Sequence, residues 1–254
     1  MQTMKSVDIL GVRVHSLSSA DKAFVLHSLL VKKQSHVVVT VNPEIVMWAQ
    51  KDRGYRDMIN AADLSIADGV GLTFASRHAG QRLHRWTGYD FVLDLMGTAA
   101  KENRSVFLLG GKPLAAHKSA LTLRKLYPTL RIAGAEQGPP IGMSGREIRV
   151  DESDQKYLIE HLRLLEPDIL LVAFGHPKQE KWIARSLHLL PSVRVAVGVG
   201  GVFEYLSGSV YRAPWAMRVL GLEWLFRVVR QPWRLPRIIT AVVRFTLAIW
   251  REKK

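Results

Sequence analysis

The chain has 254 residues, 48% hydrophobic and 23% charged, a composition typical of a globular protein with one sizeable core. It contains no cysteine, which excludes disulfides, thiolate zinc sites and cysteine nucleophiles. Its formal net charge of +14 indicates an anionic partner such as a nucleic acid, a phosphorylated substrate or a membrane surface.

Five short apolar runs rich in β-branched residues predict buried strands. Each is followed by a turn with glycine or proline and then by a helical pattern. In chain order the runs are His36–Val41, Leu64–Ala67, 105–109, 168–174 and 194–199. Alternating strands and helices favour an α/β, Rossmann-like fold with a mainly parallel sheet flanked by helices. Residues 138–154, rich in glycine, proline and charge, are predicted to form a flexible loop.

The turns after these strands hold most of the candidate functional residues. Ligands of such sheets bind where the carboxyl ends of the parallel strands meet, so we expect the turns to converge. The residues concerned are Thr40, Asn42, Asp68, Gly110, Gly111, Lys112, Lys178, Gln179 and Gly200. A buried carboxylate is costly without a partner, so Asp68 either caps the next helix or contacts a ligand. Asn42, which precedes Pro43, also suits a helix N-cap.

The end of the chain carries more than half of the charge excess. Residues 212–254 hold ten Lys and Arg against two Asp and Glu. A nucleic-acid-binding core more often spreads its basic residues over one whole face. We therefore divide the chain into an α/β domain, residues 1–212, and a basic, amphipathic, helical appendage, residues 213–254.

The last part of this appendage is predicted to be a helix from residue 236 to residue 250. On it, Arg237, Arg244 and Arg251 recur every seven residues and share one stripe among apolar residues. The segment is shorter than the roughly 20 apolar residues of a membrane span, so we expect it to lie in the membrane interface. The alternative is that the arginines form the solvated face of a helix packed on the core or on another subunit.

Several common motifs of nucleotide and metal enzymes are missing. The chain has no G-x-x-x-x-G-K-[ST] loop, and the glycine-rich stretch 198–203 ends in Phe203 where a dinucleotide fingerprint needs glycine. This disfavours a nucleotide-binding oxidoreductase. No Asp-x-Asp pair occurs, and no carboxylate–histidine cluster has the spacing of a zinc site.

Eight short motifs in a fixed order carry a family resemblance. They are VTVNPE (39–44), ADG (67–69), RWTG (85–88), FLLGGKP (107–113), GHPKQEKWIAR (175–185), GVGGVFEYLSG (198–208), RAP (212–214) and GLEWLFR (221–227). Together they resemble the WecG/TagA/CpsF glycosyltransferase family over residues 7–237. The resemblance implies transfer of a UDP-activated sugar, with inversion, to a polyprenyl-diphosphate-linked saccharide for surface polysaccharides. It also implies no metal ion or other cofactor, in agreement with the missing Asp-x-Asp.

The resemblance further implies a role for each matching residue, with Asp68 as the base that deprotonates the acceptor hydroxyl. The residues implied in catalysis are Asp68, Thr40, Asn42, Arg85 and Gln179. Those implied in substrate and nucleotide binding are Gly110, Gly111, Lys112, Lys178, Gly200 and Glu204. Those implied in binding the lipid diphosphate are Arg227, Arg234 and Arg237, whose forked donors suit a diphosphate. Glu204 stands where the family commonly has aspartate.

Less specific explanations compete with these roles. Asp68 and Gln179 can cap helices, the glycine pairs can serve turns alone, and Lys178 can be a solvated charge. The runner-up function is a non-catalytic protein that binds an anionic membrane or a nucleic acid. Nucleic acid is disfavoured because the basic residues alternate with apolar ones and form no stacking platform.

The expected location and partners follow from the same features. No apolar stretch at the start is long enough for a signal peptide, so a cytoplasmic location is the default. The family resemblance implies a peripheral protein at the cytoplasmic face of the bacterial inner membrane. The expected partners are a UDP-sugar, a polyprenyl-diphosphate-linked acceptor and the anionic membrane surface, without nucleic acid. The donor sugar (N-acetylmannosamine, its uronic acid or glucose) and a homo-oligomeric state stay open.

Overall fold

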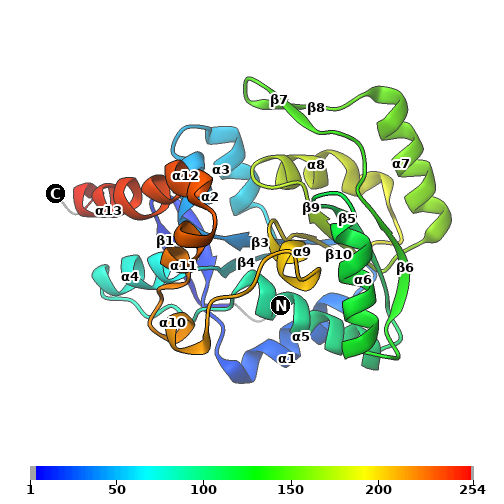
Figure 1. The fold of residues 1–254 in the computed structure, drawn as a ribbon, viewed down its shortest axis with the longest axis horizontal. Helices are drawn as coiled ribbons and strands as arrows, with labels where there is room; N and C mark the ends of the chain where they lie inside the picture. The colour runs from blue at the N-terminus through cyan, green and yellow to red at the C-terminus, as the bar shows by residue number, and fades with distance from the viewer. Residues whose placement is uncertain (1–3, 253–254) are drawn as a thin grey trace.

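A computed structural model describes residues 4–252 and contains a central six-stranded sheet (Figure 1). Its strand order is β4-β3-β10-β9-β5-β6, and every neighbouring pair is parallel. The strands are β3 (His36–Val41), β4 (Leu64–Ala67), β5 (Ser105–Gly110), β6 (Arg131–Glu136), β9 (Ile169–Ala173) and β10 (Val195–Gly198). The predicted α/β fold and all five predicted strands are confirmed.

Helices cover both faces of this sheet, which explains why the inner strands β5 and β9 are buried along their whole length. One face packs against α1 (Ser19–Val31), α5 (Gly88–Lys101) and α6 (Ala115–Leu126). The other packs against α2 (Pro43–Ala49), α3 (Arg53–Asn60), α7 (Glu152–Leu165) and α8 (Lys178–Ser186). The remaining helices before the C-terminal appendage are α4 (Val70–His78), α9 (Val202–Leu206) and the 3₁₀ turn η1 (Leu187–Leu189).

Two small antiparallel hairpins lie outside the central sheet. They are β1 (Ser6–Ile9) with β2 (Val12–His15), and β7 (Gly142–Ser144) with β8 (Glu147–Arg149). The second hairpin lies within 138–154, so the prediction of a flexible loop there is wrong. Ile141 and Ile148 are buried in the core cluster of α7 and α8, and this apolar contact orders a segment whose composition is typical of a loop.

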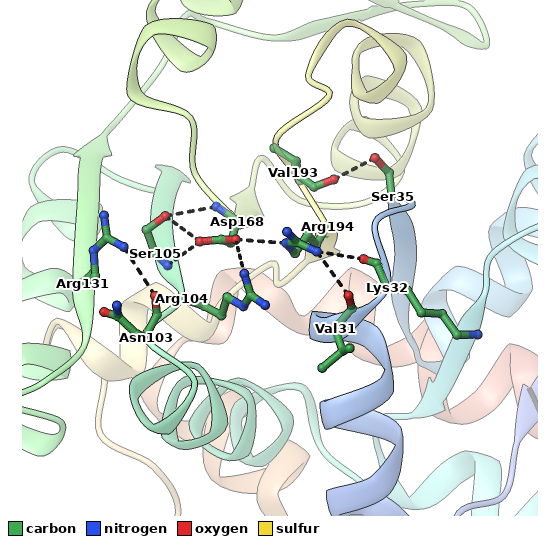
Figure 2. Close-up of polar contacts among 10 residues, drawn as sticks. All are labelled: Val31, Lys32, Ser35, Asn103, Arg104, Ser105, Arg131, Asp168, Val193 and Arg194. Atoms are coloured by element: carbon green, nitrogen blue, oxygen red, sulfur yellow. Dashed lines mark hydrogen bonds and ion pairs between the residues drawn. The ribbon is translucent and has the colours of Figure 1, made fainter.

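The amino-terminal edge of the sheet is closed by a polar network around Asp168 (Figure 2). Its carboxylate accepts hydrogen bonds from the backbone N–H of Ser105 at 2.9 Å and from Nε of Arg194 at 3.1 Å. Arg104 lies 3.3 Å from the same group. Burial alone raises the pKa of Asp168, but the bonds from Ser105 and Arg194 outweigh it and hold the pKa below its usual value. This network ties β5, β9 and β10 together at the edge opposite the predicted site.

The C-terminal appendage is helical and packs on the core beside α2 and α4 (Figure 1). Its elements are α10 (Trp215–Val219), α11 (Glu223–Arg230), η2 (Pro232–Arg234), α12 (Leu235–Ile239), the π turn η3 (Thr240–Arg244) and α13 (Phe245–Glu252). Phe245 and Ile249 are buried in the same cluster as Ile45 and Leu72. The appendage therefore shares a core cluster with the α/β part of the chain.

The π turn breaks the seven-residue stripe predicted for this helix. A π turn takes up more residues per turn than an α-helix, so side chains on either side of it lose the common register. Arg237, before the turn, donates from Nε to a Glu44 carboxylate oxygen at 2.8 Å. Arg244 and Arg251 are exposed like Arg237 but have no ion-pair partner among the described residues. The prediction of one shared face for the three arginines is wrong.

Candidate active site

Asp68 directly follows β4 at the carboxyl edge of the sheet, where the parallel topology predicts a site. It does not cap the helix that follows, because the N-cap of α4 is Gly69, at φ 105°. Gly88 closes in on the Asp68 carboxylate, and a Cβ at Gly88 would lie 3.3 Å from both Asp68 and Thr40. Because Gly88 has no side chain, its backbone N–H can approach the carboxylate of Asp68 and donate a hydrogen bond to it.

The environment of Asp68 makes it a weaker acid than usual. Burial raises its pKa to about 6 from an ordinary 3.8. The backbone N–H of Gly88 opposes this rise, the negative charge of Glu223 adds to it, and Arg227 and Arg85 partly offset it. A carboxylate with such a pKa is ionised at neutral pH and is suited to accept a proton.

The neighbouring strand end supplies Thr40 and Asn42. Thr40 donates from its hydroxyl to the carbonyl of Gly198 at 2.9 Å, a bond that spans from β3 to β10. Asn42 accepts from the backbone N–H of Ile45 at 3.0 Å, so the predicted N-cap is confirmed. Both residues line a cavity together with Asp68.

Two adjoining chambers open among the described residues at this edge, between the core and the appendage. The first, here called the aromatic chamber, has a volume of about 220 Å³ and includes Tyr89, Tyr205, Trp224, Arg85, Arg212 and Glu223. The second, here called the cationic chamber, has a volume of about 350 Å³ and includes Lys112, Arg227, Arg234, Arg237, Gln179 and Glu204. Asp68, Asn42, Glu44 and Arg227 line both chambers.

In the cationic chamber, basic side chains from three segments surround the carboxylate of Glu204. Its carboxylate lies 2.9 Å from Arg234, 3.3 Å from Lys112 and 4.0 Å from Arg227. Burial and the charge of Arg227 lower the pKa of Arg234. The Nε and Nη2 atoms of Arg227 are buried without a hydrogen-bond partner among the described residues. The chamber therefore has unused donors and excess positive charge, which suit a polyanionic ligand.

Gln179 and the glycines shape the walls of this chamber. The side-chain oxygen of Gln179 accepts from the backbone N–H of Gly175 at 3.2 Å and of Gly200 at 3.0 Å. Its amide nitrogen donates to Glu180 at 2.7 Å. The N–H of Gly111 donates to the carbonyl of Ala173 at 3.0 Å. These N–H groups already donate hydrogen bonds within the protein. Gly111 and Gly200 therefore line the chamber without offering a free N–H donor to a ligand.

Two predicted residues do not reach either chamber. Lys178 donates from Nζ to the carbonyl of Ile141 at 2.8 Å, beside the β7–β8 hairpin. Gly110, at φ 102°, ends β5 against Ala173, where a Cβ would lie 2.9 Å from the backbone carbon. Neither residue belongs to the lining of the chambers. All the other predicted site residues line one or both chambers.

Sequence reasoning assigned no role to Glu44, which lines both chambers, or to His176, which lines the cationic chamber. A carboxylate oxygen of Glu44 lies 3.2 Å from Nε2 of His176 and 2.8 Å from Nε of Arg237. Burial raises the pKa of Glu44, but His176 and Arg237 outweigh it and hold the pKa below its usual value. Both residues follow predicted strands at the carboxyl edge of the sheet. This position is the feature of the sequence that could have identified them as site residues.

The sequence profile of the Glycosyl transferase WecG/TagA/CpsF family matches residues 7–254 of this chain. The chain belongs to the WecG/TagA/CpsF glycosyl transferase family. This WecG/TagA/CpsF member is similar to the N-acetylglucosaminyldiphosphoundecaprenol N-acetyl-beta-D-mannosaminyltransferase of Bacillus subtilis (strain 168). The two are 34% identical over 224 residues, which cover 88% of this chain and 82% of the relative.

A protein of the same name from Staphylococcus aureus (strain MW2) is 30% identical over 235 residues, 91% of this chain and 87% of the relative. The WecG/TagA/CpsF member is therefore a glycosyltransferase enzyme, as the motifs predict. Membership of this family rules out the two alternatives considered from the sequence, an oxidoreductase and a non-catalytic binding protein.

Proposed function

We propose that this enzyme transfers an N-acetylmannosamine-type sugar from UDP to an N-acetylglucosamine unit carried on a polyprenyl diphosphate. The names of the similar proteins from Bacillus and Staphylococcus support this acceptor and this donor sugar. N-acetylmannosaminuronic acid and glucose are the competing donors. The β configuration in those names fits inversion, because the sugar of such UDP donors is α-linked.

The observation that carries the proposal is the position of Asp68 in the lining of both chambers. In the proposed reaction, the acceptor hydroxyl oxygen forms a bond to the anomeric carbon while the bond from that carbon to UDP breaks. The hydroxyl proton passes to Asp68, and the electron pair of the broken bond leaves on the β-phosphate of UDP. A single displacement of this kind inverts the anomeric centre. Thr40 and Asn42 lie beside the base and orient it or the acceptor.

Arg227 and Arg234, which the family resemblance implies for the lipid diphosphate, are proposed instead to stabilise the departing diphosphate of UDP, together with Lys112 and without a metal ion. Arg227, Arg234 and Lys112 surround Glu204 in the cationic chamber, and Arg85 acts on Asp68 from the other chamber. A diphosphate offers these donors more negative charge than one carboxylate does. In the proposed donor complex the arginines bind phosphate oxygens, and Glu204 faces the nucleoside.

A screen of UDP-sugars against a short-chain polyprenyl-diphosphate-linked N-acetylglucosamine tests the function. We expect transfer from UDP-N-acetylmannosamine, measured by mass spectrometry of the product, with or without a chelator. Product NMR should show a β-linkage. Absence of transfer from every UDP-sugar, or activity that disappears with the chelator and returns with a metal ion, contradicts the proposal.

The appendage is proposed to dock on an anionic membrane surface. It exposes large apolar side chains, among them Trp215, Leu220, Val229, Trp233, Val243 and Trp250. Arg230, Arg244 and Arg251 are exposed on the same segment. No helix in residues 4–252 has the length and apolar character of a membrane span. Apolar side chains flanked by arginines fit a segment that lies in the interface of anionic lipids. We accordingly propose a peripheral location at the cytoplasmic face of the inner membrane.

Liposome co-sedimentation tests this docking. The enzyme is expected to sediment with vesicles containing phosphatidylglycerol and to be released as the salt concentration rises, because the arginine contribution is screened. Trp233→Ser should reduce binding several-fold, since Trp233 is 68% exposed on the appendage. The matched control is Leu164→Ser on α7, which removes an 81% exposed leucine away from the appendage. Equal losses for the two variants, or stronger binding to an oligonucleotide than to vesicles, contradicts the docking.

A further inference from the structure

The aromatic chamber differs from the cationic chamber in size and lining. This difference indicates which part of each substrate the two chambers suit. Its volume of about 220 Å³ lies below the ~300–1,000 Å³ of sites that enclose a whole drug-sized ligand, so it suits one ring of a larger substrate. Two of the three basic groups around Glu204, Lys112 and Arg234, line the cationic chamber alone, where they suit a diphosphate. The aromatic chamber is thus free for a neutral sugar.

The walls of the aromatic chamber combine flat apolar surfaces with a few polar groups. The rings of Tyr89 and Tyr205 meet edge to face with centroids 6.0 Å apart. Arg212 lies 4.1 Å from the centroid of Tyr89, and Arg227 lies 4.7 Å from that of Tyr205. Trp224 adds a further partly exposed ring from α11. Rings that are held by neighbouring charges offer a rigid surface for the C–H face of a sugar.

Glu223, at the start of α11, faces this chamber with much of its bonding capacity unused. It accepts one hydrogen bond, from the hydroxyl of Tyr205 at 3.4 Å, among the described residues. Nε of Arg212 lies 3.8 Å away and is buried without a hydrogen-bond partner among those residues. The other end of Arg212 is fixed by Asp90, at 3.1 Å. A carboxylate and a guanidinium with spare acceptor and donor sites are therefore held side by side.

We propose that the aromatic chamber is the acceptor-sugar subsite, in which Glu223 and Arg212 bind the hydroxyl and acetamido groups of the sugar. This inference rests on the proposed function. It assigns recognition of the acceptor to the interface between the α/β part of the chain and the appendage. The carboxylate of Glu223 accepts from a sugar hydroxyl, and Arg212 donates to a carbonyl or hydroxyl oxygen. The sugar hydroxyl that reacts then faces Asp68, which lines the same chamber.

Glu223 has a second effect on the reaction through its charge. It is among the groups that raise the pKa of Asp68. Replacing Glu223 by glutamine removes a negative neighbour, so the pKa of Asp68 should fall. The acidic limb of the pH–rate profile should therefore move to lower pH, which a purely structural role of Glu223 does not predict.

Glu223→Gln tests the inference in the whole 254-residue chain by calorimetry and kinetics. Binding of a short-chain polyprenyl-diphosphate-linked N-acetylglucosamine, with UDP present, is expected to weaken about 10- to 100-fold, the range for one hydrogen bond to a charged group. The Kd for UDP alone should stay unchanged. Glu223→Asp keeps the charge but shortens the reach, so it should weaken acceptor binding without shifting the pH profile. Glu152→Gln, at an exposed site on α7, is the matched control.

The outcomes separate the inference from the proposed function. Unchanged acceptor binding in Glu223→Gln, an equal loss of UDP affinity, or no acceptor binding by the wild type overturns the subsite. Acceptor binding that depends on Glu223, in an enzyme that transfers no sugar to this acceptor, supports the subsite and contradicts the proposed function.

Discussion

Asp68→Asn is expected to lower kcat by about 10²–10⁴-fold, the usual contribution of a positioned general base. Asparagine keeps the size of the side chain and removes its ability to accept a proton at neutral pH. The measurement is transfer from UDP-N-acetylmannosamine to the short-chain acceptor. For the wild type, kcat/KM should fall about tenfold per pH unit below pH 6, because the pKa of Asp68 is raised to about 6. An Asp68→Asn enzyme of normal activity contradicts the assignment of the base.

The same variant should be more stable than the wild type. A pKa raised from 3.8 to about 6 means that the folded state binds this proton more tightly than the unfolded state does. Ionised Asp68 therefore reduces stability by about 3 kcal/mol above pH 6, and this penalty disappears as the pH falls below 4. Urea unfolding at pH 8 should show a higher free energy of unfolding for Asp68→Asn. Asp57→Asn, at an exposed site on α3, should stay within about 0.5 kcal/mol of the wild type.

Arg227→Ala is expected to lower kcat by about 10²–10³-fold, the effect of removing one preorganised donor from a developing anion. Arg227 lines both chambers, and two of its nitrogens are buried without a hydrogen-bond partner among the described residues. Arg227→Lys keeps the charge but loses the forked donors, so it should recover part of the activity. The assay uses the short-chain acceptor in detergent, where membrane docking does not limit the rate.

The matched control for this variant lies one turn further along α11. Arg230 is exposed and stacks on Tyr211 and Phe226, outside both chambers. Arg230→Ala should keep its kcat in the detergent assay. Equal losses in Arg227→Ala and Arg230→Ala contradict a specific role for Arg227 and indicate a general effect of charge.

Most of the fold could be predicted from the sequence because parallel strands buried on both faces are continuous apolar runs. The run HVVVTV and its four counterparts are of this kind. The strand β6 was missed because it is an edge strand with the mixed sequence RIAGAE and is only partly buried. The β1 and β7–β8 segments are three or four residues long, too short for a periodic pattern to stand out.

The site could be predicted where topology alone brings residues together. The carboxyl ends of parallel strands meet at one edge, so Thr40, Asn42 and Asp68 converge without any knowledge of loop conformation. Lys178 stands in such a turn, yet its direction depends on a tertiary contact with Ile141. Glu223 could not be assigned, because its place in the site depends on how α11 docks on the core.

The two sides of α11 have a consequence for how a lipid-bound substrate reaches the enzyme. Glu223 and Arg227 line the chambers, and Val229, 74% exposed, points away from them. An α-helix with its side chains is about 10–12 Å thick. In the proposed docked state, a phosphate at headgroup depth is therefore one helix width from the reacting atoms. The isoprenoid tail can stay in the bilayer throughout turnover, and the enzyme has no need of a deep channel for it.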